Sequence, residues 1–147
     1  MDMLSEPEKA YIAGLFDGEG TLGYYYKPST GYHQVQLAIY SSDIRVIHWV
    51  RDKIGHGSIT PHKGKYTKFT NWSWDLSNKS GVVNFLMTIK PYLIVKLDQA
   101  CLLLSHLDAE QKKNHGKRRR LTQPVILDRQ KVVTELKKLK TVEYCVH

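Results

Sequence analysis

The segment IAGLFDGEG at residues 12–20 places two carboxylates close together in a glycine-rich stretch. The second carboxylate, on Glu19, comes just past the expected end of a helix. Carboxylate and carbonyl oxygens suit Mg²⁺, with phosphate and water completing the set of ligands. Glu19 and the backbone carbonyl of Gly18 therefore predict a site for Mg²⁺, or for another divalent cation such as Mn²⁺, of the kind that assists phosphodiester hydrolysis.

Three small residues on the same helix, Ala10, Gly14 and Gly18, lie four positions apart, and Ala13 lies beside them. This spacing forms a strip on one helix face along which a second helix backbone can approach closely. Because the segment occurs once, we expect the second helix to come from another copy of the chain across a twofold axis. The two Glu19 carboxylates would then repel each other unless cations bridge them. The expected homodimer interface consists of Ala10, Ala13, Gly14, Asp17 and Gly18.

IAGLFDGEG resembles the LAGLIDADG signature of homing endonucleases and related maturases. The resemblance implies an intron-encoded, divalent-metal-dependent endonuclease that makes a double-strand break in a long pseudo-palindromic DNA site as a homodimer. It implies that Gly18 and Glu19 are metal ligands, with Glu19 in place of the commoner Asp, and that Asp17 is structural. Lys96 lies five residues after Pro91, where similar single-motif enzymes place a basic residue, so the resemblance implies Glu19 and Lys96 as catalytic residues.

Other interpretations of these residues remain open at this point. The segment can be an ordinary helix that ends in a glycine-rich turn, and Lys96 can be a lysine that reaches solvent from the start of a buried helix. The same scaffold can serve a noncatalytic RNA maturase or a DNA-binding regulator, and the basic composition also suits a structural RNA-binding protein. The retention of Glu19 favours catalysis.

Periodicity predicts the elements that position these residues, in an α+β fold of αββαββα order with a curved antiparallel sheet packed on helices, plus C-terminal helices. A capping box at Ser5 and Glu8 opens the first helix. The expected elements are a helix over 5–18, strands over 21–27 and 33–40, a helix from 41 or 42 to 54, strands over 58–62 and 71–77, and helices over 81–89, 93–107 and 123–140. We expect one domain over 1–147, with a core at about 5–110 and a basic segment and C-terminal helix over 111–147.

One face of the predicted sheet is polar, and such a face can lie in the major groove and contact base edges. The alternative is a solvated sheet face. Tyr24 and Tyr26 should lie on the opposite, buried or interface side. Basic residues beyond the strands suit phosphate contacts. The expected DNA-binding residues are Thr21, Gly23, Tyr25, Lys27, Gln34, Gln36, Tyr40, Ser58, Thr60, His62, Lys63, Lys65, Ser73, Asp75, Lys117, Arg118 and Arg119.

The whole composition agrees with a polyanionic partner. The 147 residues carry a formal net charge of +8, which suits double-stranded DNA as the partner. No apolar run is long enough to cross a bilayer, so no membrane partner is expected. The N-terminus has no secretion signal, so we expect an intracellular protein of a prokaryotic cytoplasm or nucleoid, or of an organelle. Cys101 and Cys145 have no spacing typical of a metal site or redox pair.

Overall fold

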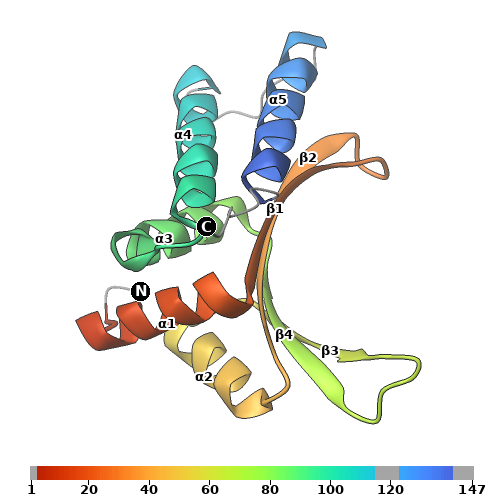
Figure 1. The fold of residues 1–147 in the computed structure, drawn as a ribbon. Helices are drawn as coiled ribbons and strands as arrows, with labels where there is room; N and C mark the ends of the chain where they lie inside the picture. Colours follow the sequence, from red (N-terminus) through yellow and green to blue (C-terminus); the bar gives the residue numbers. More distant parts are fainter. Residues whose placement is uncertain (1–2, 115–122, 141–147) are drawn as a thin grey trace, which may run out of the picture.

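A computed structural model describes residues 3–114 and 123–140 and shows an open antiparallel sheet with its helices gathered on one side (Figure 1). The strands pair in the order β1-β2-β4-β3, which confirms the predicted α+β class. The elements are α1 (Glu6–Glu19), β1 (Gly20–Lys27), β2 (Tyr32–Ser41), α2 (Ile44–Ile54), β3 (Ser58–Lys63), β4 (Thr70–Leu76), α3 (Lys79–Ile89), the 3-10 helix η1 (Lys90–Tyr92), α4 (Leu97–Asn114) and α5 (Gln123–Lys140).

Helix α1 begins as the sequence predicts and runs one residue further than expected. The backbone N–H of Glu8 donates to the Ser5 hydroxyl, and the Glu8 carboxylate accepts from the Ser5 N–H at 2.9 Å. The helix continues through Gly18 to Glu19, and the N–H of Gly20 donates to the carbonyl of Phe16. A side chain at Gly20 would collide with the Phe16 ring and carbonyl oxygen, so this position requires glycine. Glu19 is therefore held at the junction of α1 and β1.

The side of the sheet that faces the helices forms the core. Leu22, Leu37, Ile39 and Trp74 are fully buried there, as the alternation in the strands predicts. Of the two tyrosines expected to be buried or at an interface, Tyr24 is buried, whereas Tyr26 is 47% exposed in the single chain. Tyr26 lies one residue before the end of β1, beside the ring of His33.

The segment before α4 differs from the single helix that was predicted over 93–107. A 3-10 turn at η1 is followed by irregular backbone, and α4 begins only at Leu97. The Asp17 carboxylate accepts hydrogen bonds from the backbone N–H groups of Ile94 at 2.8 Å and Lys96 at 2.9 Å. Because a side chain from α1 satisfies these donors, the segment does not need to be helical. This contact brings Lys96 to the end of α1.

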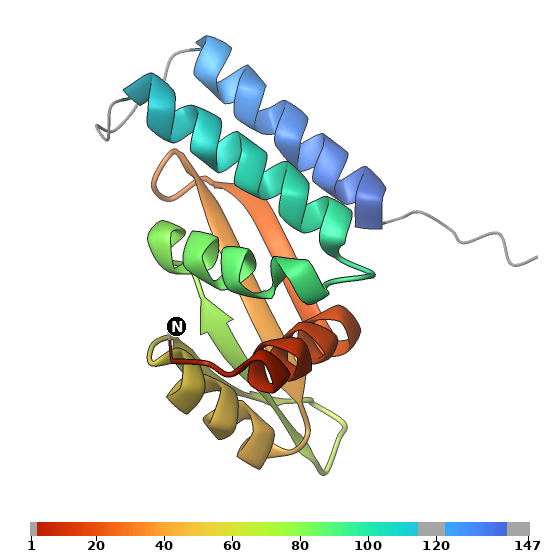
Figure 2. The same cartoon turned by 90° about the vertical axis from the view of Figure 1, so that its left-hand side faces the viewer.

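Helices α4 and α5 lie side by side at the end of the molecule opposite α2 (Figure 2). A buried ion pair joins them, in which Arg129 Nε donates to the Glu110 carboxylate at 2.7 Å. His106 Nε2 lies 3.1 Å from the hydroxyl of Tyr24 on β1. Burial raises the pKa of Tyr24 and lowers the pKa of His106, so both groups favour their neutral forms. The pair and this contact fix the two helices to the first strand. No described helix is long and apolar enough to cross a lipid bilayer.

Candidate active site and nucleic-acid face

The two acids of the motif have different surroundings. Both carboxylate oxygens of Asp17 accept backbone hydrogen bonds from the segment before α4, so this acid is used within its own chain. Glu19 is exposed at the end of α1, and among the described residues its carboxylate has no hydrogen bond or ion pair. Glu19 is therefore free to bind a ligand, while Asp17 holds the backbone that carries Lys96.

Lys96 directly precedes α4, where its carbonyl accepts from the N–H of Ala100 at 2.9 Å, and its side chain reaches the end of the motif. Its ammonium donates to the carbonyl of Asp17 at 2.6 Å and lies 5.9 Å from the centre of the Phe16 ring. Burial lowers the pKa of Lys96, and the charges of Asp17 and Glu19 act in the opposite direction. The structure thus brings together Glu19 and Lys96, which are 77 positions apart in the sequence. This is the pair that the resemblance implied.

A second lysine, which sequence reasoning missed, lies close enough to Lys96 for the two positive charges to repel each other. Burial and the positive charge of Lys96 lower the pKa of Lys140, the last residue of α5. The end of α5 therefore adds a cation close to Lys96. The sequence offers no signal for it, because Lys140 is one of several lysines at the end of an amphipathic helix.

The donor set of one chain fits a divalent cation only in part. Mg²⁺ prefers hard oxygen ligands. The Glu19 carboxylate supplies such oxygens, and the adjacent carbonyl of Gly18 is a second candidate ligand. Within residues 3–114 and 123–140, no group of three or more His, Cys, Asp and Glu side chains could hold a metal ion. Among the described residues, Glu19 and the carbonyl of Gly18 are therefore the candidate ligands, and phosphate and water can complete such a set.

The small residues of α1 divide between its two sides. Ala10, Gly14 and Gly18 are exposed, and a Cβ atom added at either glycine would meet no atom within 4 Å. Ala13, in contrast, is fully buried in its own core, so its placement in the dimer interface is wrong. Ala13 shares the inward face of α1 with the buried residues Ile12 and Phe16, because helix residues three to four positions apart lie on one face. Asp17 is half-buried and bound within the chain.

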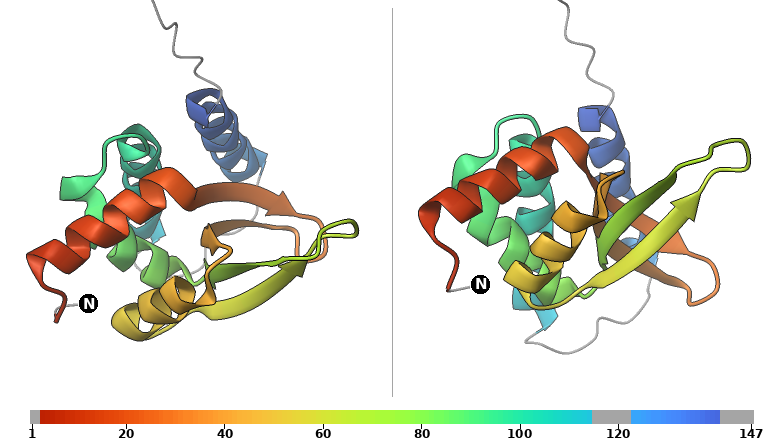
Figure 3. Two further views of the ribbon diagram at one scale, coloured as in Figure 1. Left: turned by 60° about the horizontal axis from the view of Figure 1, so that its bottom comes forward. Right: turned by 90° about the horizontal axis from the view of Figure 1, so that it is seen from below.

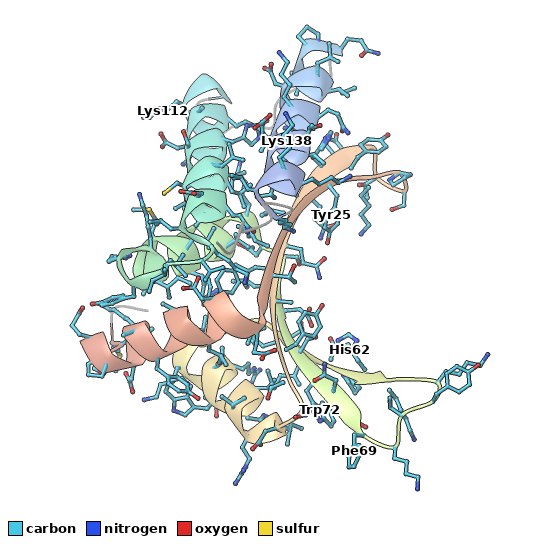
Figure 4. All side chains as sticks on the ribbon, in the orientation of Figure 1. Tyr25, His62, Phe69, Trp72, Lys112 and Lys138 are labelled. Atoms are coloured by element: carbon cyan, nitrogen blue, oxygen red, sulfur yellow. The ribbon has the colours of Figure 1, made fainter. Side chains whose placement is uncertain are left out.

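The open side of the sheet gathers the polar positions that the alternation predicted. Cross-strand pairing puts Thr21 opposite Ala38, Ala38 opposite Asp75 and Asp75 opposite Ser58, so these rows share a face. Tyr25 and His62 lie on the concave side, away from the helices (Figure 4). The register puts on this face Thr21, Gly23, Tyr25, Lys27, Gln34, Gln36, Tyr40, Ser58, Thr60, His62, Ser73 and Asp75.

Several of these side chains are already linked to one another. The Ser73 hydroxyl donates to the Asp75 carboxylate at 2.6 Å and lies 2.7 Å from His62 Nε2, which therefore acts as the donor to Ser73. Ser73 is fully buried, so the expectation that it contacts DNA directly does not fit the structure, and it instead orients its two neighbours. The Tyr25 hydroxyl donates to the Gln36 side chain.

Only some of the basic residues expected at phosphates lie in the described part of the structure. Lys63 ends β3 and Lys65 follows in the loop, and both are exposed. Lys117, Arg118 and Arg119 lie outside the described residues.

The fold and the exposed Glu19 carboxylate at the end of α1 agree with the resemblance of the motif to homing endonucleases. No protein-family model matches the sequence, and no curated protein matches it. Solved structures do: the archaeal intron-encoded homing endonuclease I-Vdi141I, complexed with DNA, is 18% identical with a TM-score of 0.72, over 97% of this chain and 89% of that one. I-CvuI, in complex with its target in the presence of Ca, is 15% identical with a TM-score of 0.71, over 96% and 87%. The chain has the homing-endonuclease fold.

A third structure has the same fold in a longer chain. The LAGLIDADG homing endonuclease I-SmaMI, bound to cleaved DNA, is 17% identical with a TM-score of 0.66, and the match covers 91% of this chain but 45% of the I-SmaMI chain. The resemblance of IAGLFDGEG to the LAGLIDADG signature is thus confirmed at the level of the fold.

Proposed function

We propose that this protein is a homing endonuclease that cleaves a specific duplex DNA site. The observation that carries the proposal is the exposed Glu19 carboxylate, which makes no hydrogen bond or ion pair within residues 3–114 and 123–140, next to the partly buried ammonium of Lys96. A protein that only binds nucleic acid has no need to hold a free acid beside a lysine of lowered pKa. The noncatalytic alternatives, an RNA maturase or a DNA-binding regulator, leave this pair without a role.

The proposed active form is a homodimer. Gly14 and Gly18 leave a strip of exposed backbone on α1 that no side chain within residues 3–114 and 123–140 fills. A second copy of α1 on this strip would bring two Glu19 residues together and so complete the oxygen ligands that one chain lacks. The existence of the same fold in a chain of about twice the length, that of I-SmaMI, supports a pair of such units.

In this dimer Glu19, with the carbonyl of Gly18, would hold Mg²⁺ or a similar divalent cation. A cation held by these two residues would supply charge stabilisation at the scissile phosphate and would make water a better nucleophile. Lys96 contributes a positive charge beside the same phosphate, and because its pKa is lowered it releases a proton more readily than an exposed lysine. Asp17 fixes Lys96 by its backbone, and Lys140 adds positive potential.

The concave sheet face would contact the base edges of the duplex. Amide groups from β2, the imidazole of β3 and the carboxylate of β4, with hydroxyl and ammonium groups from β1, give this face both donors and acceptors, which is what base discrimination in the major groove requires. Asp75 and His62 would act as one unit, because Ser73 links them.

Cleavage of randomised DNA tests the proposal. Purified protein is incubated with a plasmid library that carries a randomised segment, in Mg²⁺ or in EDTA, and the cut ends are sequenced. The proposal expects cutting within one family of partly palindromic sequences, in Mg²⁺ only. Tight and specific duplex binding without cutting in Mg²⁺ or Mn²⁺ would instead support a regulator.

A further inference from the structure

The hairpin formed by β3 and β4 projects beyond the helices (Figure 3). Its loop carries two exposed aromatic rings. Tyr66 is 91% exposed and Phe69 is 82% exposed. Exposed apolar surface that is gathered in one place and rimmed by polar residues is typical of an interaction site. The polar positions on the concave face of the sheet do not include Tyr66 or Phe69, and neither ring belongs to the core.

The loop is held by groups other than the two rings. The N–H of Thr67 donates to the carbonyl of Gly64 at 3.4 Å, and the Thr67 hydroxyl donates to the carbonyl of Phe69 at 3.3 Å. A side chain at Gly64 would meet the Thr67 hydroxyl, at 2.6 Å. Because the turn is fixed by backbone and threonine, substitution of Tyr66 or Phe69 should leave the hairpin folded.

The charge of this loop selects the kind of partner. Residues 63–69 contain Lys63, Lys65 and Lys68 and no acidic residue. The ammonium of Lys65 lies 5.8 Å from the centre of the Tyr66 ring. A phosphate bound by Lys65 would therefore lie close to Tyr66, and the neighbouring sugar or base would come within reach of the ring.

We propose that the tip of the β3–β4 hairpin, residues 63–69, is a separate DNA-contact surface in which Tyr66 and Phe69 pack against bases or sugars at the outer end of the bound duplex. The proposal rests on the proposed function and adds to it a contact outside the concave sheet face. Aromatic and apolar side chains that press between base steps unstack them and bend the duplex, so the tip would favour sequences that deform easily at this position.

The test compares two sets of variants on one duplex, which is enriched from a randomised pool by binding to the wild-type protein. Tyr66→Ser/Phe69→Ser removes the rings, and Lys63→Gln/Lys65→Gln/Lys68→Gln removes the charges. Leu127→Ser, which removes a 59% exposed side chain on α5, is the matched control. Affinity is measured over a range of salt concentrations, and 2-aminopurine placed at the ends of the duplex reports unstacking.

The ring variant should bind about tenfold or more weakly at every salt concentration, with the slope of log affinity against log salt unchanged. The lysine variant should lose about 2 to 3 units of that slope. The rise in 2-aminopurine fluorescence that wild type produces should be absent with the ring variant only.

Several results would overturn the proposal. If the ring variant binds the duplex as tightly as wild type does, this proposal fails and the proposed endonuclease does not. The same holds if the ring variant binds the duplex normally and loses affinity only for a structured RNA that is tested beside it. If the ring variant changes the sedimenting species instead, the tip is a contact between copies of the chain. If the wild-type protein enriches no duplex, the proposed function fails together with this inference.

Discussion

Replacement of Gly14 by alanine should affect the folded monomer and the dimer in opposite directions. Gly14 lies inside α1, where alanine is better than glycine by about 1 kcal/mol, and its added Cβ would meet no atom of its own chain within 4 Å. The free energy of unfolding of the monomer should therefore rise by about 1 kcal/mol. In a dimer joined through α1, the two new methyl groups would crowd the closest approach of the helices, which costs about 1–3 kcal/mol. Association should weaken by roughly 5- to 150-fold.

Two measurements separate these effects. Urea denaturation of dilute protein gives the stability of the monomer, and sedimentation equilibrium gives the dissociation constant of the dimer. Asn84→Ala, at an exposed position of α3, is the control, because it should also favour its helix but leave association unchanged. If Gly14→Ala gains the expected stability and the dimer is as tight as wild type, Gly14 is not at the contact and the reasoning is refuted.

Three further predictions concern the groups around the motif. Asp17→Ala should lower the free energy of unfolding by about 2–4 kcal/mol, because the N–H groups of Ile94 and Lys96 lose a charged acceptor; stability equal to wild type in a urea titration would contradict this. Lys96→Met should slow cleavage by about 10²- to 10⁴-fold with binding of the duplex changed little, and parallel losses of both in gel assays would show a binding role instead. His106 has a lowered pKa, so near pH 6.5 the unfolded chain binds a proton at this residue and the folded chain does not. The free energy of unfolding should therefore be highest above that pH and should fall as the pH drops below it. In His106→Gln, which keeps a polar group near Tyr24, this fall should be smaller, and an unchanged pH profile would exclude His106 as its source.

Most of the fold follows from local patterns in the sequence. The capping box at Ser5 and the alternation in the strands predict elements whose bounds differ from the structure by one or two residues. The alternation also assigns the polar face of the sheet correctly, because a strand residue and its second neighbour must share a side.

The errors come from contacts between distant segments. The irregular backbone before α4 depends on the Asp17 carboxylate, which no local pattern around residues 93–96 reveals. Ala13 looks like part of the small-residue strip by type, but its position on the helix turns it inward beside Phe16. Ser73 has the polarity of a surface residue and is buried because His62 and Asp75 bind its hydroxyl above the sheet.

The candidate site shows the same division. Resemblance to a family implies Glu19 and Lys96, and only the structure shows that they are neighbours and that Glu19, unlike Asp17, has no hydrogen bond to the part of the chain that the structure describes. Lys140 could not be predicted, because its proximity to Lys96 depends on how α5 docks on α4 and β1, through the buried Arg129–Glu110 pair.

The most direct test of the central claim, that Glu19 makes this fold a nuclease, is the cleavage of the enriched duplex by Glu19→Gln in Mg²⁺. The substitution removes a charged oxygen ligand and keeps the size of the side chain, and Glu135→Gln on the exposed side of α5 is the matched control. We expect wild type and the control to cut at the same rate, and Glu19→Gln to bind the duplex with nearly unchanged affinity but to cut it at least about 10³-fold more slowly. Equal cutting rates for Glu19→Gln and wild type would contradict the account.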